Sequence, residues 1–175
     1  MSGVWLAGLG AALALNVALA GDAGAGRAPY GTWYEWAHYH AANSLECAQA
    51  TVLILWPSAA GIEVLRQCRD GEGAMRRSDE EATGSGGALS WKVYSIWPFY
   101  HRERVLLADP RNRYLVVGAD GLDDVMVFFA TPDPAADLVG DVVARLAALG
   151  VEVEALVHAR RIDTAHAARD ASDLH

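Results

Sequence analysis

The chain has 175 residues, with 14 Lys and Arg against 22 Asp and Glu, so its formal net charge is −8 at pH 7. An acidic chain offers no positive field to neutralise phosphates, which argues against nucleic acid as the main partner. Hydrophobic residues make up 53% of the chain and charged residues only 21%, which excludes an intrinsically disordered protein and indicates one compact domain.

Residues 1–20 are typical of a secretory signal peptide. Val4–Ala20 is an uncharged run rich in Ala and Leu, although no basic residue precedes it and its length also lies at the lower limit for a membrane span. No cysteine follows this run, so a lipid anchor at this end is not expected. We expect an exported protein, periplasmic or secreted, with a flexible linker at residues 21–29, a folded domain at residues 30–161 and a disordered tail at residues 162–175.

Runs of alternating apolar and polar residues, separated by turn-forming residues, predict a series of β-strands along this domain. In chain order the expected strands are Thr32–Tyr39, Ala50–Trp56, Ile62–Cys68, Met75–Ala82, Trp91–Trp97, Arg104–Ala108, Tyr114–Gly118, Asp124–Thr131 and the short Leu156–Ala159. Their spacing of about ten residues is typical of meandering antiparallel sheets.

One segment has helical periodicity, with apolar residues at Leu138, Val142, Val143, Leu146 and Leu149. Asp133 is the expected N-cap, with Pro134 in the first turn, and Gly150 is the expected left-handed terminator. Roughly eight strands before a single helix predict an all-β fold. We expect an eight-stranded antiparallel up-and-down β-barrel with a C-terminal α-helix packed outside.

The chain has two cysteines, Cys47 and Cys68. In an exported protein two thiols are more often paired than free, so we expect a disulfide, with two buried reduced thiols as the alternative. Pairing would close a span of 21 residues. Such a closure is worth roughly 3 kcal/mol in the chain-entropy model.

Several motifs resemble those of the lipocalin family. Gly31-Thr32-Trp33 resembles the lipocalin G-x-W motif, in which the Trp plugs the closed end of the barrel. Further motifs fall at the spacing of the bacterial lipocalin and apolipoprotein D branch, namely Ala37-His38-Tyr39, Trp97-Pro98-Phe99-Tyr100, Asp109-Pro110, Val116-Val117-Gly118, Thr131-Pro132 and Leu149-Gly150. The resemblance covers about residues 30–160.

The resemblance implies roles for particular residues. Gly31 and Trp33 would form the barrel base, and Cys47 and Cys68 stand where members of this branch often carry a paired cysteine. The arginine that commonly packs across the first-strand Trp is Ala130 here, so another group must complete the base. The family's ligands imply a cavity for fatty acids, lysophospholipids and similar apolar molecules.

Alternation, read together with this resemblance, places a mostly apolar set of side chains on the inner face of the barrel. The set is Ala37, Tyr39, Ala50, Val52, Ile54, Val64, Trp91, Val93, Val105, Leu107, Tyr114, Val116, Met126 and Phe128. Such a lining suits an aliphatic or isoprenoid body, because each buried CH₂ contributes about 0.8 kcal/mol. Ordinary core packing is the alternative for every one of these residues.

Two carboxylates, Glu35 and Glu103, also fall at inward-facing positions. A buried carboxylate is costly unless it is paired or protonated, and Arg66 and Arg104 are the expected partners. These carboxylates are therefore candidates for polar groups in the cavity that anchor a ligand head group. The alternative, which we favour, is a structural ion pair near one end of the barrel.

His38 and His40 place two imidazoles on one strand face. No cysteine or carboxylate at ligand spacing accompanies them, so we expect no metal site. The sequence carries no nucleophile elbow, phosphate-binding loop or dinucleotide fingerprint, so no cofactor and no catalytic residue are expected.

Three functions remain open. The leading hypothesis is binding and transport or storage of a hydrophobic small molecule, with membrane lipids among the partners, by a monomer or weak dimer that is not an enzyme. The second is an enzyme acting on a bound lipid, with Glu35, Tyr39 or Glu103 as acid or base. The third is a filled barrel that contacts another protein through Tyr34 and Trp36 or through the loop around Gly84.

Overall fold

The computed structural model describes residues 28–39, 47–59, 61–84, 89–96, 99–119 and 121–159. The expected signal peptide at residues 1–20, most of the linker, the tail at residues 162–175, His40 and Trp97-Pro98 lie outside these residues. Within the described ranges, no helix combines the length and the apolar character needed to cross a membrane.

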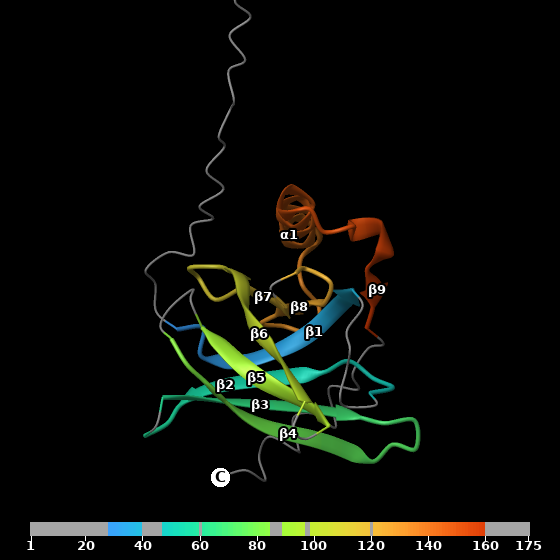
Figure 1. Ribbon diagram of the computed structural model, residues 1–175. Helices are drawn as coiled ribbons and strands as arrows, with labels where there is room; N and C mark the ends of the chain where they lie inside the picture. The colour runs from blue at the N-terminus through green and yellow to red at the C-terminus, as the bar shows by residue number, and fades with distance from the viewer. Residues whose placement is uncertain are drawn as a thin grey trace, which may run out of the picture.

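Eight antiparallel strands form one strongly curved sheet (Figure 1). They are β1 (Gly31–Tyr39), β2 (Val52–Pro57), β3 (Ile62–Arg69), β4 (Met75–Ala82), β5 (Ser90–Ile96), β6 (Phe99–Ala108), β7 (Tyr114–Ala119) and β8 (Val125–Phe129). The spatial order is β4-β3-β2-β1-β8-β7-β6-β5, so sequence neighbours pair and β1 also pairs with β8. This order confirms the up-and-down barrel expected from the strand spacing.

The barrel is nearly closed, and its weakest junction lies between β4 and β5. In the described part of these strands a single bridge joins Thr83 to Ser90. The Thr83 amide donates to the Ser90 carbonyl at 2.8 Å, and the Ser90 amide donates back at 3.0 Å. Most residues of β4 are polar and solvent-exposed, as expected for the edge of a sheet. We call this junction the seam.

In the described part of the chain one α-helix, α1 (Ala136–Leu149), packs on the outside of the barrel (Figure 1). Its N-cap is Ala135, which makes no side-chain capping bond, so the prediction of Asp133 as the cap was wrong. The carbonyl of Asp133 instead accepts a bond from the Thr131 hydroxyl at 3.4 Å, in a turn before the helix. Gly150 ends the helix with φ 91°, as predicted.

The chain then returns to the sheet. A short 3₁₀ turn, η2 (Val153–Ala155), leads to β9 (Val157–His158), which pairs with the second half of β1. The final strand expected at residues 156–159 is therefore present.

The two faces of the sheet carry separate apolar clusters. The interior cluster lies inside the barrel and consists of Trp33, Leu53, Leu55, Ile62, Val64, Ala82, Leu89, Trp91, Val93, Val105, Leu115, Val117, Met126 and Phe128. The helix-side cluster lies between the barrel and α1 and consists of Tyr114, Val116, Val125, Val127, Phe129, Val142, Leu146 and Val151. Because β7 and β8 are covered on both faces, every residue of β8 is buried.

Candidate functional site

The barrel interior contains part of the apolar set that alternation predicted. The residues that belong to the interior cluster are Val64, Trp91, Val93, Val105, Met126 and Phe128. They come from β3, β5, β6 and β8, so they surround the interior from several sides. Their inward orientation is confirmed, and contact with a ligand stays a prediction for all of them.

A bulge in β1 reverses the expected orientation of its second half. Across the irregularity between Glu35 and Ala37 the register with β8 shifts by one residue. Ala37 and Tyr39 therefore lie opposite residues of the helix-side cluster, whereas His38 lies opposite Met126 of the interior cluster. Since opposite residues of paired strands share a face, the prediction that Ala37 and Tyr39 point inward was wrong.

The orientation of β2 is also opposite to the prediction. Leu53 and Leu55 belong to the interior cluster, so Val52 and Ile54, which alternate with them, face outward. Ala50 is buried, but it precedes the strand and belongs to neither apolar cluster. The run Val-Leu-Ile-Leu is apolar at every position, so composition alone could not fix its register.

Further along the chain, Leu107, Tyr114 and Val116 also pack on the helix side. A second register shift, between Val105 and Leu107, places Leu107 opposite Val116 on the helix side. In β7 the inward residues are Leu115 and Val117. Both faces of β7 are apolar because one faces the interior and the other faces α1.

The two residues that the resemblance assigns to the barrel base, Gly31 and Trp33, lie at the start of β1. Trp33 is 1% exposed and belongs to the interior cluster. Its indole N–H donates to the Pro29 carbonyl at 2.9 Å, and Ala28 packs against the same cluster. Gly31 adopts φ 136°, which lets the chain turn from this segment into β1. The segment before β1 thus packs against the interior cluster at this end of the barrel.

A buried ion pair crosses the interior. Arg66 on β3 and Glu103 on β6 are each 1% exposed, and the guanidinium holds both carboxylate oxygens, with Nη1 to Oε1 at 3.2 Å. Burial opposes ionisation of Glu103, but Arg66 and His101 outweigh it, so the pKa of Glu103 lies below its ordinary value. The expected pairing of Glu103 with Arg66 is therefore present, and it matches the structural ion pair named above as the alternative to a ligand anchor.

His101 extends this pair toward β8. Its Nε2 lies 3.2 Å from Glu103 Oε1 and 3.9 Å from Asp124 Oδ2. The hydrogen bond to Glu103 raises the pKa of His101, against the opposing effect of burial. His101, Glu103 and Asp124 could together hold a metal ion, since their ligand atoms lie within 4.8 Å of one another. However, Arg66 already occupies both oxygens of Glu103, and its positive charge opposes a cation there.

Glu35 forms a second buried polar group. Its Oε2 accepts from the Thr51 amide at 2.7 Å, and its Oε1 lies 2.6 Å from His38 Nδ1. The hydrogen bond to Glu35 raises the pKa of His38, with burial opposing it. Sequence reasoning placed Glu35 correctly inside the barrel but missed His38, because the bulge that turns His38 inward has no clear sequence signature.

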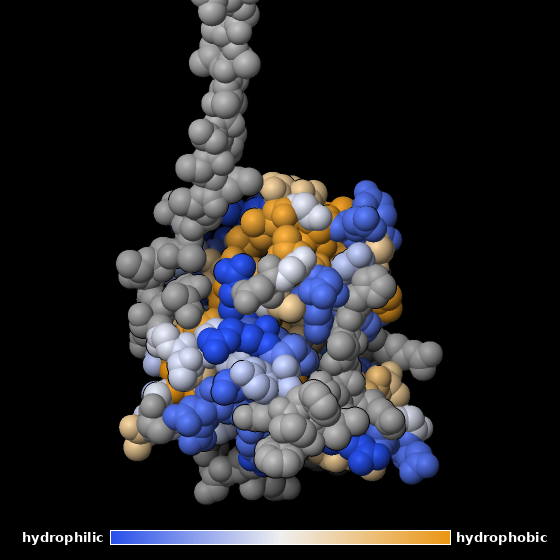
Figure 2. Space-filling model, viewed as in Figure 1, coloured by the Kyte–Doolittle hydropathy of each residue, from blue (hydrophilic) through white to orange (hydrophobic). Residues whose placement is uncertain are grey.

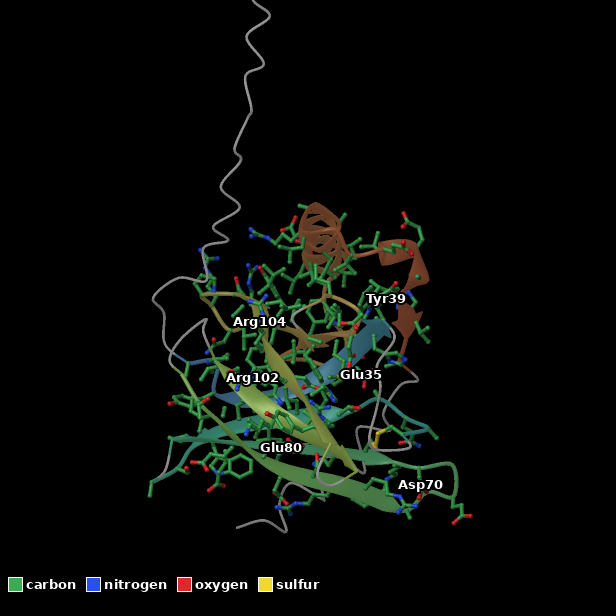
Figure 3. All side chains as sticks on the ribbon, in the orientation of Figure 1. Glu35, Tyr39, Asp70, Glu80, Arg102 and Arg104 are labelled. Carbon is green, nitrogen blue, oxygen red and sulfur yellow. A yellow bond between two sulfur atoms is a disulfide. The ribbon has the colours of Figure 1, made fainter. Side chains whose placement is uncertain are left out.

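A pocket of about 300 Å³ opens at the seam. Its charged lining residues are Asp79, Glu80 and Glu81 from β4, Lys92 from β5 and Arg102 from β6, and Trp91 of the interior cluster also lines it. Figure 3 labels Glu80 and Arg102 on these strands. On the face shown in Figure 2, hydrophilic residues gather over the strands and apolar residues gather beside α1. The pocket therefore has a charged rim and an aromatic wall, and the sequence analysis did not predict it.

The residues proposed for an enzyme do not share one site. Tyr39 lies on the helix side, while Glu35 and Glu103 lie inside the barrel. Glu35 is held by Thr51 and His38, and Glu103 by Arg66 and His101.

The aromatics proposed for protein contact are only half-exposed. Tyr34 and Trp36 are both partly buried. Trp36 packs edge-on against Phe129, with ring centroids 6.0 Å apart, and against His158 at 4.5 Å. Trp36 is thus partly covered by β9 and offers only part of its ring to a protein partner.

A disulfide joins Cys47 to Cys68, with Cα atoms 5.6 Å apart, which confirms the predicted pairing. The bond ties the segment before β2 to the end of β3. A disulfide is stable in an oxidising compartment and fits an exported protein.

No protein-family model matches this sequence, and no curated protein matches it either. Solved structures match in fold. The cockroach allergen Per a 4 is 11% identical with a TM-score of 0.62, over 79% of this chain and 88% of the allergen. Lobster apocrustacyanin A1 is 12% identical with a TM-score of 0.60, over 78% of this chain and 79% of that chain. H1 crustacyanin from the lobster Homarus americanus is 12% identical with a TM-score of 0.57, over 77% of each chain. These proteins are lipocalins, so the chain has the lipocalin fold.

Proposed function

We propose that the barrel binds a small molecule with an apolar body, which reaches the interior through the seam. The observation that carries this proposal is the pocket of about 300 Å³ between β4 and β5, with Trp91 of the interior cluster in its wall. This volume lies at the lower end of the range for ligand pockets, about 300–1,000 Å³. A junction held by the single Thr83–Ser90 bridge in the described strands is also the easiest part of the barrel to open.

The interior cluster supplies the apolar surface for such a molecule. Val93 follows Trp91 on the same face of β5, and the cluster also contains Val105 from β6 and Met126 and Phe128 from β8. Burying about ten CH₂ groups contributes roughly 8 kcal/mol, and association costs at least about 4 kcal/mol. The remainder is at most about 4 kcal/mol, which corresponds to a dissociation constant of about 1 mM or weaker for a chain of this length, so tighter binding requires further apolar or polar contacts.

From the sequence motifs we further propose the class of ligand and the role of binding. The ligand would be a membrane-derived lipid, such as a fatty acid or lysophospholipid, and the protein would carry or store it after export. The bacterial and apolipoprotein D branch is likewise proposed from the motifs alone. The oxidised cysteine pair supports the exported location.

The test uses the delipidated full-length protein and the uncharged apolar probe N-phenyl-1-naphthylamine, whose fluorescence rises in apolar surroundings. We expect saturable binding with one site per chain. Val93→Phe fills the interior beside Trp91 and should weaken probe binding at least about fivefold. Val143→Phe adds the same ring on the partly buried face of α1, outside the barrel, and should change the affinity less than twofold.

Circular dichroism melting curves establish that both variants fold. Absence of saturable binding in the wild-type protein would contradict the proposal. Equal weakening by both substitutions would contradict an interior site, because only Val93 belongs to the interior cluster.

A further inference from the structure

Two walls of the seam pocket carry a buried polar atom that lacks a hydrogen-bond partner among the described residues. The Trp91 indole N–H is one, and Glu80 Oε2 is the other. Trp91 itself is only 2% exposed. A buried donor or acceptor without a partner costs about 1–3 kcal/mol, so such atoms mark a place where another group completes the bonding.

Both side chains lie on the inner side of the barrel wall. Glu80 lies opposite Val64, and Val64 belongs to the interior cluster. Trp91 lies opposite Glu103, which Arg66 holds. Burial raises the pKa of Glu80, and the positive charge of Arg66 only partly opposes this. The pocket thus offers one N–H donor and one carboxyl oxygen beside the interior.

The charges around the pocket disfavour an anionic ligand. Its lining contains the carboxylates of Asp79, Glu80 and Glu81. The two lining cations already have partners: Lys92 Nζ lies 4.6 Å from the centroid of the Tyr100 ring, and Arg102 Nη1 donates at 3.3 Å to the hydroxyl of Ser90, which also lines the pocket. A ligand carboxylate would therefore meet a lining in which three carboxylates outnumber two cations.

A hydroxyl group has the chemistry that these two atoms lack. Its oxygen can accept from an N–H such as that of Trp91, and its O–H can donate to an oxygen such as Glu80 Oε2, and it carries no charge. We propose that the seam pocket is a subsite for the hydroxyl head of an apolar alcohol, and that it selects alcohols over carboxylates of the same chain length. This inference rests on the proposed function and replaces fatty acids, as the preferred class, with uncharged hydroxyl-bearing lipids.

The test compares decanol with decanoate at pH 8, where the acid is ionised, by displacement of N-phenyl-1-naphthylamine from the full-length protein. We expect decanol to bind the wild-type protein at least about tenfold more tightly than decanoate. Glu80→Gln keeps the side-chain volume but replaces an acceptor oxygen with an amide donor. This variant should reduce the preference for decanol at least about fivefold.

Glu81→Gln is the matched control, since it removes the same charge from the pocket lining at a solvent-exposed position. It should leave the preference within twofold of wild type. Trp91→Phe removes the N–H donor but keeps an aromatic ring. It should lower the affinity for decanol more than it lowers the affinity for the probe.

Three results would overturn the inference while leaving the proposed function intact. They are equal or tighter binding of decanoate, an equal loss of preference in both glutamine variants, and probe binding without displacement by decanol. If neither the probe nor decanol binds, the proposed function fails, and the subsite fails with it.

Discussion

The buried pair of Arg66 and Glu103 predicts a large and specific change in stability. Each side chain is 1% exposed, so removing one partner leaves the other charge inside the barrel without compensation. Glu103→Gln or Arg66→Met should each lower the free energy of unfolding by about 3–5 kcal/mol. That is a large share of the roughly 5–15 kcal/mol by which domains are stable.

The double variant Arg66→Met with Glu103→Leu removes both charges and replaces them with apolar groups. It should recover most of the loss, because the desolvation cost of both charges disappears. Urea unfolding at pH 7, followed by tryptophan fluorescence and circular dichroism, measures all three variants. The exposed pair of Arg77 and Asp79, 3.0 Å apart, is the control, and Asp79→Asn should cost less than about 1 kcal/mol.

The reasoning is refuted if each single variant loses less than about 1 kcal/mol. It is also refuted if the double variant is as unstable as the two single losses added together. Either result would mean that water reaches the pair and screens the charges inside the barrel.

Three further predictions concern pH, the disulfide and glycine. The hydrogen bond to Glu103 raises the pKa of His101 in the folded state above 6.5, the ordinary pKa of histidine. Protonation of His101 therefore stabilises the fold fully below pH 6.5, and this stabilisation is lost as the pH rises through the folded-state pKa. His101→Gln should therefore flatten the dependence of Tm on pH in this range. Reduction of the disulfide, which spans 21 residues, should lower the free energy of unfolding by roughly 3 kcal/mol, measured by urea titration with and without reductant. Gly118→Ala should destabilise the protein by more than about 2 kcal/mol in thermal melts, because its Cβ would overlap the Asp124 carbonyl oxygen. Gly140 lies at an exposed position of α1 with open space around a Cβ, so Gly140→Ala should stabilise the protein by about 0.5–1 kcal/mol in the same melts.

The strands and the helix could be predicted because their signals are local. The turn residues between the strands place most strand ends within two residues of those observed, but β6 begins at Phe99 and not at the predicted Arg104. The barrel followed from element order, and the disulfide from the compartment and cysteine count. The predicted cap of α1 was wrong by two residues, since the N-cap is Ala135 and not Asp133.

The orientation of individual residues could not be predicted equally well. Strict alternation fails at the bulge after Glu35, and one shifted residue exchanges the inward and outward faces of the rest of β1. In β2 and β7 both faces are apolar, so hydrophobicity does not distinguish Ile54 from Leu55 or Val116 from Val117. Which face of β7 points into the barrel and which packs against α1 depends on tertiary contacts, and local hydrophobicity does not encode it.

The seam pocket was missed for a related reason. Met75–Ala82 is a polar strand that reads as an ordinary solvent-exposed edge. Glu80 turns inward beside Trp91 only because β3 and β5 flank that edge in the folded barrel. The alternation of apolar and polar residues singled out Glu35 and Glu103 as inward-facing carboxylates. It gave no such signal for Glu80, because nearly all of its neighbours on β4 are polar.

Methionine methyl NMR tests most directly whether an apolar molecule enters the barrel. Two of the chain's three methionines lie in the described residues: Met126 belongs to the interior cluster, while Met75 is 42% exposed on β4. Titration of ¹³C-methyl-methionine protein with decanol should shift the Met126 signal and leave the Met75 signal in place. A Met126 signal that stays unchanged at saturating decanol, or a shift at Met75 alone, would contradict an interior binding site.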